Sequence, residues 1–573
     1  MRSAPTTKSS RGDQIAAALI GLLALSAFFT LFIFRAADDN RLTSWQWVFA
    51  GADVWNIGGL LVAGIALAYP VSRVSLWGRR PALALFLASF AVGAAFWRKP
   101  EVIVDASRYF TQAKHLELYG IGYFLGGWGR EIAAWTDLPL VPFLYGVLFA
   151  VWGESRLPIQ VFTTLLFSGT VVLTYLLGKA LWDERVGAAA GALLLGMPYL
   201  LTQVPLMLVD VPTMFFLTLA LFTTVRALDR GGAGWTALAA VALACAALSK
   251  YSVWPLLGAL LIVFLVYAWK EPGPTLRRAG AIVLAAAALA GPIVLWKHDV
   301  IGEQLRLLWG YQAPGLGRWR EGFASTFLFQ IHPFIAAAAA YSVVVAVRKR
   351  DAKYAIVAWA LVLVVLFRIE RSRYLLPTLP MLALMASYGL GEIRSPELRR
   401  FTVACIVIAS LVVALGGYLP FLAGTSAANL KHAGEYLDSL EADTVEVFAL
   451  PQTESEVNPA VSVPLLDLFT RKRIVYRPGP EGTVTGAEVE TSPLRFTWEY
   501  RTPRYYAGGG SDGQAAVVII SAHRDQRLPD YLEQKIKNYR LSKAFEVSDE
   551  WFLYQTLVRV YQPAERGLAG SRL

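Results

Sequence analysis

The feature that most constrains this chain is a series of apolar runs, most of them close to the length needed to cross a lipid bilayer. A helix needs about 20 residues to span the hydrocarbon core. Lipid cannot form hydrogen bonds with the backbone, so each run must be a helix. The 573-residue chain is 56% hydrophobic and only 17% charged, which excludes an ordinary soluble globular protein. The sequence therefore predicts a polytopic α-helical membrane protein.

We predict about thirteen membrane-spanning helices from these runs. They are approximately Ile15–Phe34, Trp47–Tyr69, Pro81–Trp97, Pro158–Leu181, Val186–Val204, Val211–Ala227, Trp235–Leu248, Val253–Trp269, Ala279–Trp296, Ala324–Val347, Tyr354–Phe367, Tyr374–Leu390 and Phe401–Phe421. Cys245 and Cys405 both lie inside such runs. They are interpreted as small core residues, which favours neither a disulfide nor a metal site.

Basic residues in alternate loops predict the orientation of these helices. No small-residue cleavage site follows the first apolar run, so we interpret that run as an anchor and not as a removed signal peptide. With a basic N-terminus in the cytoplasm, every even-numbered turn is basic, as the positive-inside rule requires. These turns carry Arg73, Arg79, Arg80, Lys179, Arg185, Arg226, Arg230, Arg277, Arg278, Arg348, Lys349, Arg350, Lys353, Arg394, Arg399 and Arg400. We therefore predict a multi-pass protein of the cytoplasmic membrane, with the C-terminal part outside and with a net charge that reflects topology, not nucleic-acid binding.

The predicted outer side carries a long loop, residues 98–157. Its first part, up to Asp137, is too polar to cross the membrane. Its second part, Leu138–Trp152, is apolar but only about fifteen residues long. A full crossing here would invert every later basic loop, so we predict a helix at the membrane interface. A later outer segment, Lys297–Phe323, is rich in aromatic and basic residues and is predicted to lie at headgroup level.

The composition changes near residue 425, where a small extracytoplasmic α/β domain is predicted. Its strands are predicted at Val445–Leu450, Arg473–Tyr476, Ala515–Ile520, Ala544–Val547 and Phe552–Tyr561, and its helices at Asn429–Leu440 and Pro529–Asn538. We thus divide the chain into additional N-terminal helices (1–80), a transmembrane catalytic module (81–424), the α/β domain (425–565) and a disordered tail (566–573).

Ionisable residues cluster at the predicted outer ends of the helices. The most informative segment contains Asp105, Arg108 and Tyr109, because a carboxylate at the mouth of a membrane bundle is costly unless it binds or reacts. A carboxylate there can act as a general base toward a hydroxyl acceptor. Fixed cations can stabilise a departing lipid phosphate. Residue types alone leave a transporter's ion path equally open. The set is Asp105, Asp137, Asp210, Lys250, Lys297, His298, Asp299, Arg368, Glu370, Arg371 and Arg373.

Several stretches resemble the GT-C glycosyltransferases, and most closely the family-39-like group of protein O-mannosyltransferases and lipid A aminoarabinose transferases. In order, they begin at Asp105-Ala-Ser-Arg-Tyr109, Asp137-Leu-Pro-Leu, Lys179-Ala-Leu-Trp-Asp-Glu-Arg, Leu206-Met-Leu-Val-Asp210-Val-Pro, Ala247-Leu-Ser-Lys250-Tyr251 and Arg371-Ser-Arg373-Tyr374-Leu-Leu-Pro. The resemblance covers about residues 81–421. It implies a polyprenyl-phosphate-linked sugar donor, a glycan, lipid or protein acceptor, inversion at the anomeric carbon, and no cofactor or metal.

The resemblance also implies roles for individual residues. Asp105 would be the general base or would orient the acceptor, Asp210 would help to form the sugar pocket, and Asp137 matches a third acidic position. The positions expected to bind substrate are Arg108, Tyr109, Lys250, Tyr251, Lys297, His298, Arg371, Arg373 and Tyr374, with Lys250, Arg371 and Arg373 facing the lipid phosphate. The chain departs from the family in having Ala106 where relatives often have a second acid, and Leu138 where they often have a basic residue or His. It also has two additional N-terminal helices.

Other interpretations remain open for these residues and for the chain. Asp105 and Asp210 each stand at a helix start, where Asp is a favoured N-cap, and Asp137 could be a turn residue. The cations could extend to lipid headgroups. For the whole chain the alternatives are a transporter or flippase of lipid-linked sugars, which would favour repeated halves and broken helices, and a non-catalytic membrane component that presents the C-terminal domain.

Overall fold

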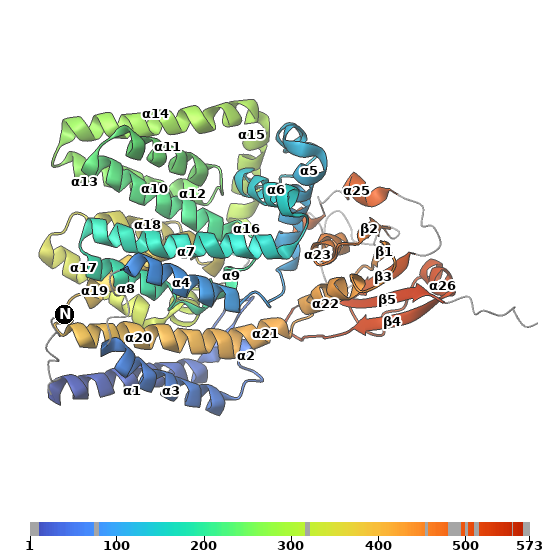
Figure 1. Ribbon diagram of the computed structural model, residues 1–573, viewed down its shortest axis with the longest axis horizontal. Coiled ribbons are helices and arrows are strands. Elements are labelled where there is room, and N and C mark those ends of the chain that lie inside the picture. The colour runs from blue at the N-terminus through green and yellow to red at the C-terminus, as the bar shows by residue number, and fades with distance from the viewer. Residues whose placement is uncertain are drawn as a thin grey trace, which may run out of the picture.

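The chain forms a bundle of helices with a mixed α/β domain at one end (Figure 1). The structure is a computed structural model, which describes residues 11–73, 80–315, 321–452, 457–478, 494–498, 502–508, 515–552 and 554–564. The start of the first helix and the α/β domain lie at opposite ends of the bundle. The predicted class, a polytopic helical protein with a C-terminal α/β domain, is confirmed. The predicted disordered tail lies outside the described residues.

Six helices in the described part of the chain are long and apolar enough to cross a membrane. They are α1 (Arg11–Ile33), α3 (Val54–Arg73), α7 (Arg156–Leu181), α10 (Asp210–Arg230), α14 (Pro272–Trp296) and the continuous run Pro396–Ala423, made of α20 (Pro396–Val413), η6 (Ala414–Tyr418) and α21 (Leu419–Ala423). Shorter helices lie between them: α4 (Pro81–Ala95), α8 (Glu184–Leu194), α11 (Ala233–Ala247), α12 (Val253–Leu256), α13 (Gly258–Ala268), α17 (Pro333–Lys349), α18 (Tyr354–Leu366) and α19 (Leu379–Leu390). Each of the thirteen predicted crossings overlaps at least one of these helices.

Several predicted crossings are interrupted, and proline marks three of the breaks. Proline lacks the N–H that would continue a helix and is favoured at a helix start. Thus α8 stops at Leu194 and a short α9 (Pro198–Gln203) begins at a proline. The π-helical η4 (Ser325–Ile331) ends before Pro333, where α17 begins. The 3₁₀ segment η5 (Ser372–Thr378) contains Pro377 and precedes α19.

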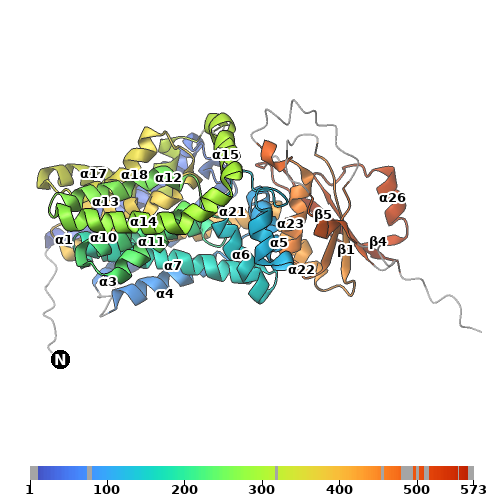
Figure 2. The ribbon, with the colours of Figure 1, turned by 90° about the horizontal axis from the view of Figure 1, so that it is seen from above.

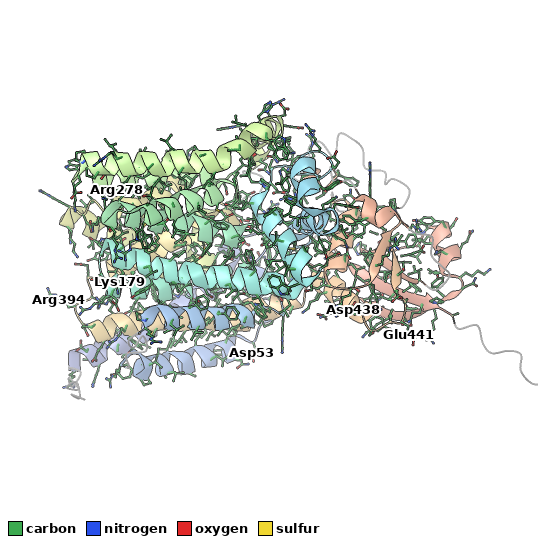
Figure 3. All side chains as sticks on the ribbon, turned by 45° about the horizontal axis from the view of Figure 1, so that its top comes forward. Asp53, Lys179, Arg278, Arg394, Asp438 and Glu441 are labelled. Carbon is green, nitrogen blue, oxygen red and sulfur yellow. The ribbon has the colours of Figure 1, made fainter. Side chains whose placement is uncertain are left out.

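Three basic residues from different predicted cytoplasmic turns lie at the same end of the bundle. Figure 3 shows Lys179, Arg278 and Arg394 at the end away from the α/β domain, whereas Asp53 lies at the nearer end. The loops that carry these three residues are separated by four predicted crossings each, and an alternating up-and-down path puts such loops at the same end.

Residues 103–127 of the predicted outer loop form a long helix, α5 (Ile103–Gly127), which is kinked at Gly120 with φ of 78°. The residues predicted to form an interfacial helix are helical, as α6 (Leu140–Trp152). The second outer segment forms α15 (His298–Leu307), η2 (Leu308–Gln312) and α16 (Ala313–Gly315). Figure 2 shows α5 and α6 between the bundle and the α/β domain.

The α/β domain contains a five-stranded sheet in the order β2-β1-β3-β5-β4. The first three strands of this order are parallel, whereas β5 is antiparallel to both β3 and β4. The strands are β1 (Thr444–Ala449), β2 (Arg473–Tyr476), β3 (Ala516–Ser521), β4 (Tyr539–Phe545) and β5 (Leu557–Pro563), and the helices are α22 (Ala427–Leu437), α23 (Ser462–Leu468), α25 (Arg504–Ala507) and α26 (Asp530–Ile536), with 3₁₀ turns η7 (Pro459–Val461) and η8 (Arg495–Thr497). Strand β4 begins five residues before the predicted start at Ala544; as a largely exposed edge strand, it lacks the buried apolar pattern that would have predicted its first residues.

The domain and the bundle share one apolar core at their junction. The same cluster contains Tyr109 and Phe110 of α5, Leu465 of α23, Val518 of β3 and Tyr506. All five are buried. Apolar burial of this kind holds α5 between the two parts of the molecule.

Candidate active site at the mouth of the bundle

Three carboxylates and three cations form an unbroken ion-pair chain where the bundle meets α5. Asp210 accepts hydrogen bonds from Lys250 Nζ at 2.6 Å and from Arg373 Nε at 2.7 Å. Arg373 Nη1 donates at 2.5 Å to Asp105. Arg108 continues the chain, since its Nη2 lies 3.3 Å from the other carboxylate oxygen of Asp105.

Asp137 ends the ion-pair chain on its other side. Arg108 Nε lies 2.8 Å from Asp137 Oδ2. Gln112 Nε2 donates to the same oxygen at 3.2 Å, and the Tyr109 hydroxyl donates to Oδ1 at 3.4 Å. Signs therefore alternate along the whole chain, which runs Asp137, Arg108, Asp105, Arg373, Asp210, Lys250.

The local folds explain how these six residues meet. Asp105 and Arg108 are three residues apart on the first turns of α5, so their side chains share one face. Asp210 is the first residue of α10, and Arg373 lies in η5, which is followed at once by α19. The remaining two residues are in loops: Lys250 follows α11 and Asp137 precedes α6.

For Asp105, Asp210 and Arg373, the alternatives of helix capping and of contact with lipid headgroups do not fit the geometry. The N-caps of α5 and α10 are Val102 and Val209, and neither Asp105 nor Asp210 caps its helix. The side chain of Arg373 is 6% exposed and pairs with two carboxylates instead of reaching for headgroups. The predicted grouping of Asp105, Asp137, Asp210, Lys250 and Arg373 in one place is what the structure has.

The balance between burial and neighbouring charges shifts the pKa values of Asp105 and Asp137 in opposite directions. Burial alone would raise the pKa of Asp105, but Arg373, Arg108 and Arg371 more than offset it, and the pKa lies well below its ordinary value. Burial raises the pKa of Asp137, and Arg108 offsets only part of that effect. Asp105 is therefore held ionised.

Tyr374 separates two cations at the edge of the ion-pair chain. Lys250 Nζ lies 4.7 Å from the centre of its ring, and the guanidinium of Arg371 lies 5.1 Å from it. Arg371 Nη1 also donates to the Tyr374 hydroxyl at 3.3 Å. Arg371 is only partly buried. Arg371 therefore adds a positive charge beside the ion-pair chain, in which three carboxylates balance three cations.

Some predicted substrate-binding residues lie apart from this chain. Lys297 Nζ donates to the carbonyl oxygens of Gly126 at 2.7 Å and Trp128 at 3.1 Å, so it fixes the end of α5. His298 is exposed and pairs with its exposed neighbour Asp299. Tyr251 is linked to Asp137 of the ion-pair chain through a third residue, Gln304.

Two glutamines that sequence reasoning missed support Asp137. Gln304 of α15 accepts a hydrogen bond from the Tyr251 hydroxyl at 2.5 Å and donates to the backbone carbonyl of Asp137 at 2.9 Å. Gln112 donates to the Asp137 side chain. Its spacing of one helical turn from Arg108 was a usable signal. Gln304 gave none, because its contact depends on the packing of α15.

A cavity of about 1040 Å³ opens beside Arg108. Its walls come from α5, the loop before α6, α15 and the α/β domain. Both aromatic and polar side chains line these walls, and they include Gln112, His115, Tyr119, Tyr123, Trp135, Gln304, Phe496 and Trp498. Arg108 thus belongs to both the cavity wall and the ion-pair chain.

One protein family and several solved structures are similar to this chain. Residues 137–296 match the family of dolichyl-phosphate-mannose-protein mannosyltransferases. Among solved structures, ArnT from Cupriavidus metallidurans bound to undecaprenyl phosphate is similar over 86% of this chain and 100% of its own, with 14% identity and a TM-score of 0.52. The apo state of the same protein is similar over 83% of this chain and 97% of its own, with 15% identity and a TM-score of 0.50. No curated protein sequence gives a significant match.

These matches extend from the second carboxylate of the ion-pair chain, Asp137, to the end of α14 in sequence, and over most of the chain in fold. They agree with the resemblance drawn from the motifs. The chain therefore has the GT-C fold of the membrane glycosyltransferases that use lipid-phosphate-linked sugars.

Proposed function

We propose that this protein transfers a monosaccharide from a polyprenyl-phosphate carrier to an acceptor hydroxyl on the extracytoplasmic side of the membrane. The observation that carries the proposal is the ion-pair chain, which places a carboxylate, Asp105, between two arginines at a membrane mouth. A general base and phosphate-binding cations in one place are what this reaction needs. The similar ArnT protein has been solved bound to undecaprenyl phosphate, which supports a lipid phosphate here.

Every bond and proton of the transfer is accounted for by the acceptor, the lipid-phosphate donor and the Asp105 carboxylate. The acceptor oxygen attacks the anomeric carbon opposite the phosphate, so the configuration at that carbon inverts. The carbon–oxygen bond to the phosphate breaks, and the polyprenyl phosphate leaves with the electron pair. The proton of the acceptor hydroxyl passes to the Asp105 carboxylate. No step assigns a role to a metal ion.

The charge balance of the ion-pair chain suggests how the donor activates the base. Asp105 is a weak base while Arg373 holds it, because its pKa is lowered. A donor phosphate brings further negative charge to a place where each carboxylate of the ion-pair chain is already paired with a cation. We infer that the phosphate competes with Asp105 for Arg373, with Arg371 as an additional cation. Asp105 then becomes more basic when the donor is in place.

The cavity beside Arg108 is a suitable acceptor site. It adjoins Asp105 through Arg108, and its aromatic walls can stack on a sugar or another flat apolar face. The basic turns at the opposite end of the bundle support a cytoplasmic location for that end, by the positive-inside rule. The cavity and the α/β domain then face outward.

Asp105→Asn tests the proposal. We would reconstitute purified protein in lipid nanodiscs with undecaprenyl-phosphate monosaccharides and a membrane-derived acceptor fraction, and measure release of undecaprenyl phosphate. The variant should turn over about 10²- to 10⁴-fold more slowly. It should keep or tighten its affinity for undecaprenyl phosphate, because Arg373 loses a competing carboxylate.

The matched control is Asp53→Asn, which changes an exposed aspartate at the same end of the bundle. Asp53 accepts hydrogen bonds from the first backbone N–H groups of α3, and asparagine caps a helix equally well. Normal turnover by Asp105→Asn would disprove the assignment of the base. Movement of a labelled lipid-linked sugar between leaflets without sugar transfer would favour the flippase interpretation.

A further inference from the structure

The two additional N-terminal helices bring a buried polar loop to the active-site end of the bundle. Helices α1 and α3 pack with α20 through apolar side chains that include Phe28, Ile57, Leu61, Ala409 and Val413. Between them lie η1 (Arg35–Ala37) and α2 (Trp45–Val48), joined by residues 38–44. Figure 1 shows α2 at the end of the bundle that faces the α/β domain.

Asp38 anchors this loop through neutral donors, and no ion pair to it is found among the described residues. Its carboxylate accepts hydrogen bonds from Trp45 N at 2.7 Å, Gln330 Nε2 at 2.8 Å, Asn40 N at 3.1 Å and the Ser325 hydroxyl. The residue is 3% exposed. Four donors to one buried carboxylate define its orientation closely. The loop is thereby fixed to η4, which supplies Ser325 and Gln330.

Asn40 connects this loop to the arginines of the active site. Its side-chain oxygen accepts from Thr43 N at 2.7 Å and from Leu42 N at 3.0 Å, so the loop itself orients the amide. Its Nδ2 then donates to the Ser372 hydroxyl at 3.0 Å. Ser372 stands between Arg371 and Arg373 in the sequence.

Two further contacts hold the same serine. The backbone N–H of Ser372 donates to Glu321 Oε2 at 2.7 Å, and its hydroxyl lies 3.0 Å from the hydroxyl of Thr326. Thr326 also donates to the carbonyl oxygen of Glu370 at 3.2 Å. Ser372 is 3% exposed and Glu321 is 3% exposed. The backbone that carries Arg371 and Arg373 is thus held by Asn40 of the N-terminal loop and by Glu321 and Thr326.

We propose that residues 38–44 form a positioning element for the arginines at 371 and 373, with Asn40 acting through Ser372. Arg373 must direct Nε to Asp210 and Nη1 to Asp105 at the same time, so a small shift of its backbone breaks one of the two contacts. Apolar packing alone already attaches α1 and α3 to α20. The hydrogen bonds of the polar loop fix the orientation of the segment that carries the arginines, which non-directional apolar burial cannot do. The inference rests on the proposed transfer reaction and deepens it.

The test is a double-mutant cycle of Asn40→Ala and Ser372→Ala in the full-length protein. Each single variant should lower kcat by about 10- to 100-fold, because a catalytic group is displaced, and should leave the KM for the acceptor nearly unchanged. If Asn40 acts through Ser372, the double variant should lose no more than the less active single variant. Ser372→Ala removes one hydroxyl only, and it serves if Asn40→Ala fails to fold. The matched control is Gln46→Ala, which removes an exposed amide from α2, directly after the proposed element.

Hydrogen exchange gives a readout that does not depend on activity. In Asn40→Ala, exchange in peptides covering residues 370–376 should quicken about tenfold, as expected for the loss of one buried hydrogen bond, while α7 and α10 keep wild-type rates. Unchanged exchange at 370–376 overturns the proposal, and so does an equal rise throughout the bundle, which would indicate a general scaffold role. A wild-type protein that transfers no sugar would refute the proposed reaction, whereas the exchange data would still decide whether Asn40 fixes the arginine segment.

Discussion

The ion-pair chain differs in its charge balance from a second charged cluster, which lies about two helical turns further along α5. In the second, Lys114 Nζ lies 2.6 Å from Glu154 and 2.7 Å from Asp467 of α23, with Glu117 close by. We call these four residues the junction cluster. The Tyr506 hydroxyl donates to the same Asp467 oxygen at 2.6 Å. The ion-pair chain balances three carboxylates with three cations, whereas the junction cluster sets one cation against three carboxylates.

The difference appears in the pKa values. Asp105 stays ionised because arginines lower its pKa. In the junction cluster, burial and the charge of Asp467 raise the pKa of Glu154 to about 8, even with Lys114 beside it. One carboxyl group of the junction cluster is therefore protonated at neutral pH. A balanced chain is ready to exchange partners with an anion, and an unbalanced cluster holds the α/β domain in a way that depends on pH.

The largest effect should come from Arg373→Ala, which breaks the balance of the ion-pair chain. Two carboxylates, one of them 1% exposed, would lose their shared cation. We expect a loss of about 3–5 kcal/mol in stability and of about 10²- to 10³-fold in kcat. Unfolding in detergent and turnover of lipid-linked sugar measure the two effects.

Arg394→Ala is the control for this variant, since it removes an exposed arginine at the far end of the bundle. Stability equal to that of the control would show that Asp105 and Asp210 do not depend on Arg373, and the comparison between the two clusters would fail.

Lys114→Met should have a smaller effect, and one that depends on pH. The three acidic groups of the junction cluster can take up protons when their cation is lost, so the cost is about 2 kcal/mol at pH 8.5 and less at pH 5.5. Limited proteolysis between α21 and α22 at both pH values measures how firmly the α/β domain is held. A defect as large at pH 5.5 as at pH 8.5 would contradict the role given to acidic excess.

Glu154→Gln isolates the titration itself. The pKa of Glu154 is about 8 in the folded protein and is raised from 4.5. The folded state therefore binds the proton more tightly than the unfolded state between these values, and stability falls as pH rises through this window. The slope is at most about 1.4 kcal/mol per pH unit. Thermal unfolding from pH 5 to pH 9 should show a shallower fall for the variant than for the wild type, and parallel curves would rule out Glu154 as the titrating group.

The sequence predicted one of these clusters and not the other, for a physical reason. The crossings follow from apolar length alone, and Asp105, Asp210 and Arg373 stand out as charges beside apolar runs. Lys114 and Asp467 are separated by more than 350 positions, and each is an ordinary polar residue within its own segment. Their pairing depends on how α23 docks on α5. In the same way, Asn40 and Ser372 meet only because α1 and α3 pack on α20, which local patterns do not specify.

The smallest effect we predict is that of Gln304→Met, which leaves every charge of both clusters in place. Gln304 is 3% exposed and links Tyr251 to the backbone of Asp137. Methionine has a similar shape but cannot form either hydrogen bond, so about 1 kcal/mol should be lost, with a fall in kcat of about tenfold or less. Arg306→Gln, an exposed change two residues further along α15, is the control. If Gln304→Met impaired transfer as severely as Arg373→Ala, neutral support of Asp137 would matter as much as charge balance, and the ion-pair chain would not be the centre of the reaction.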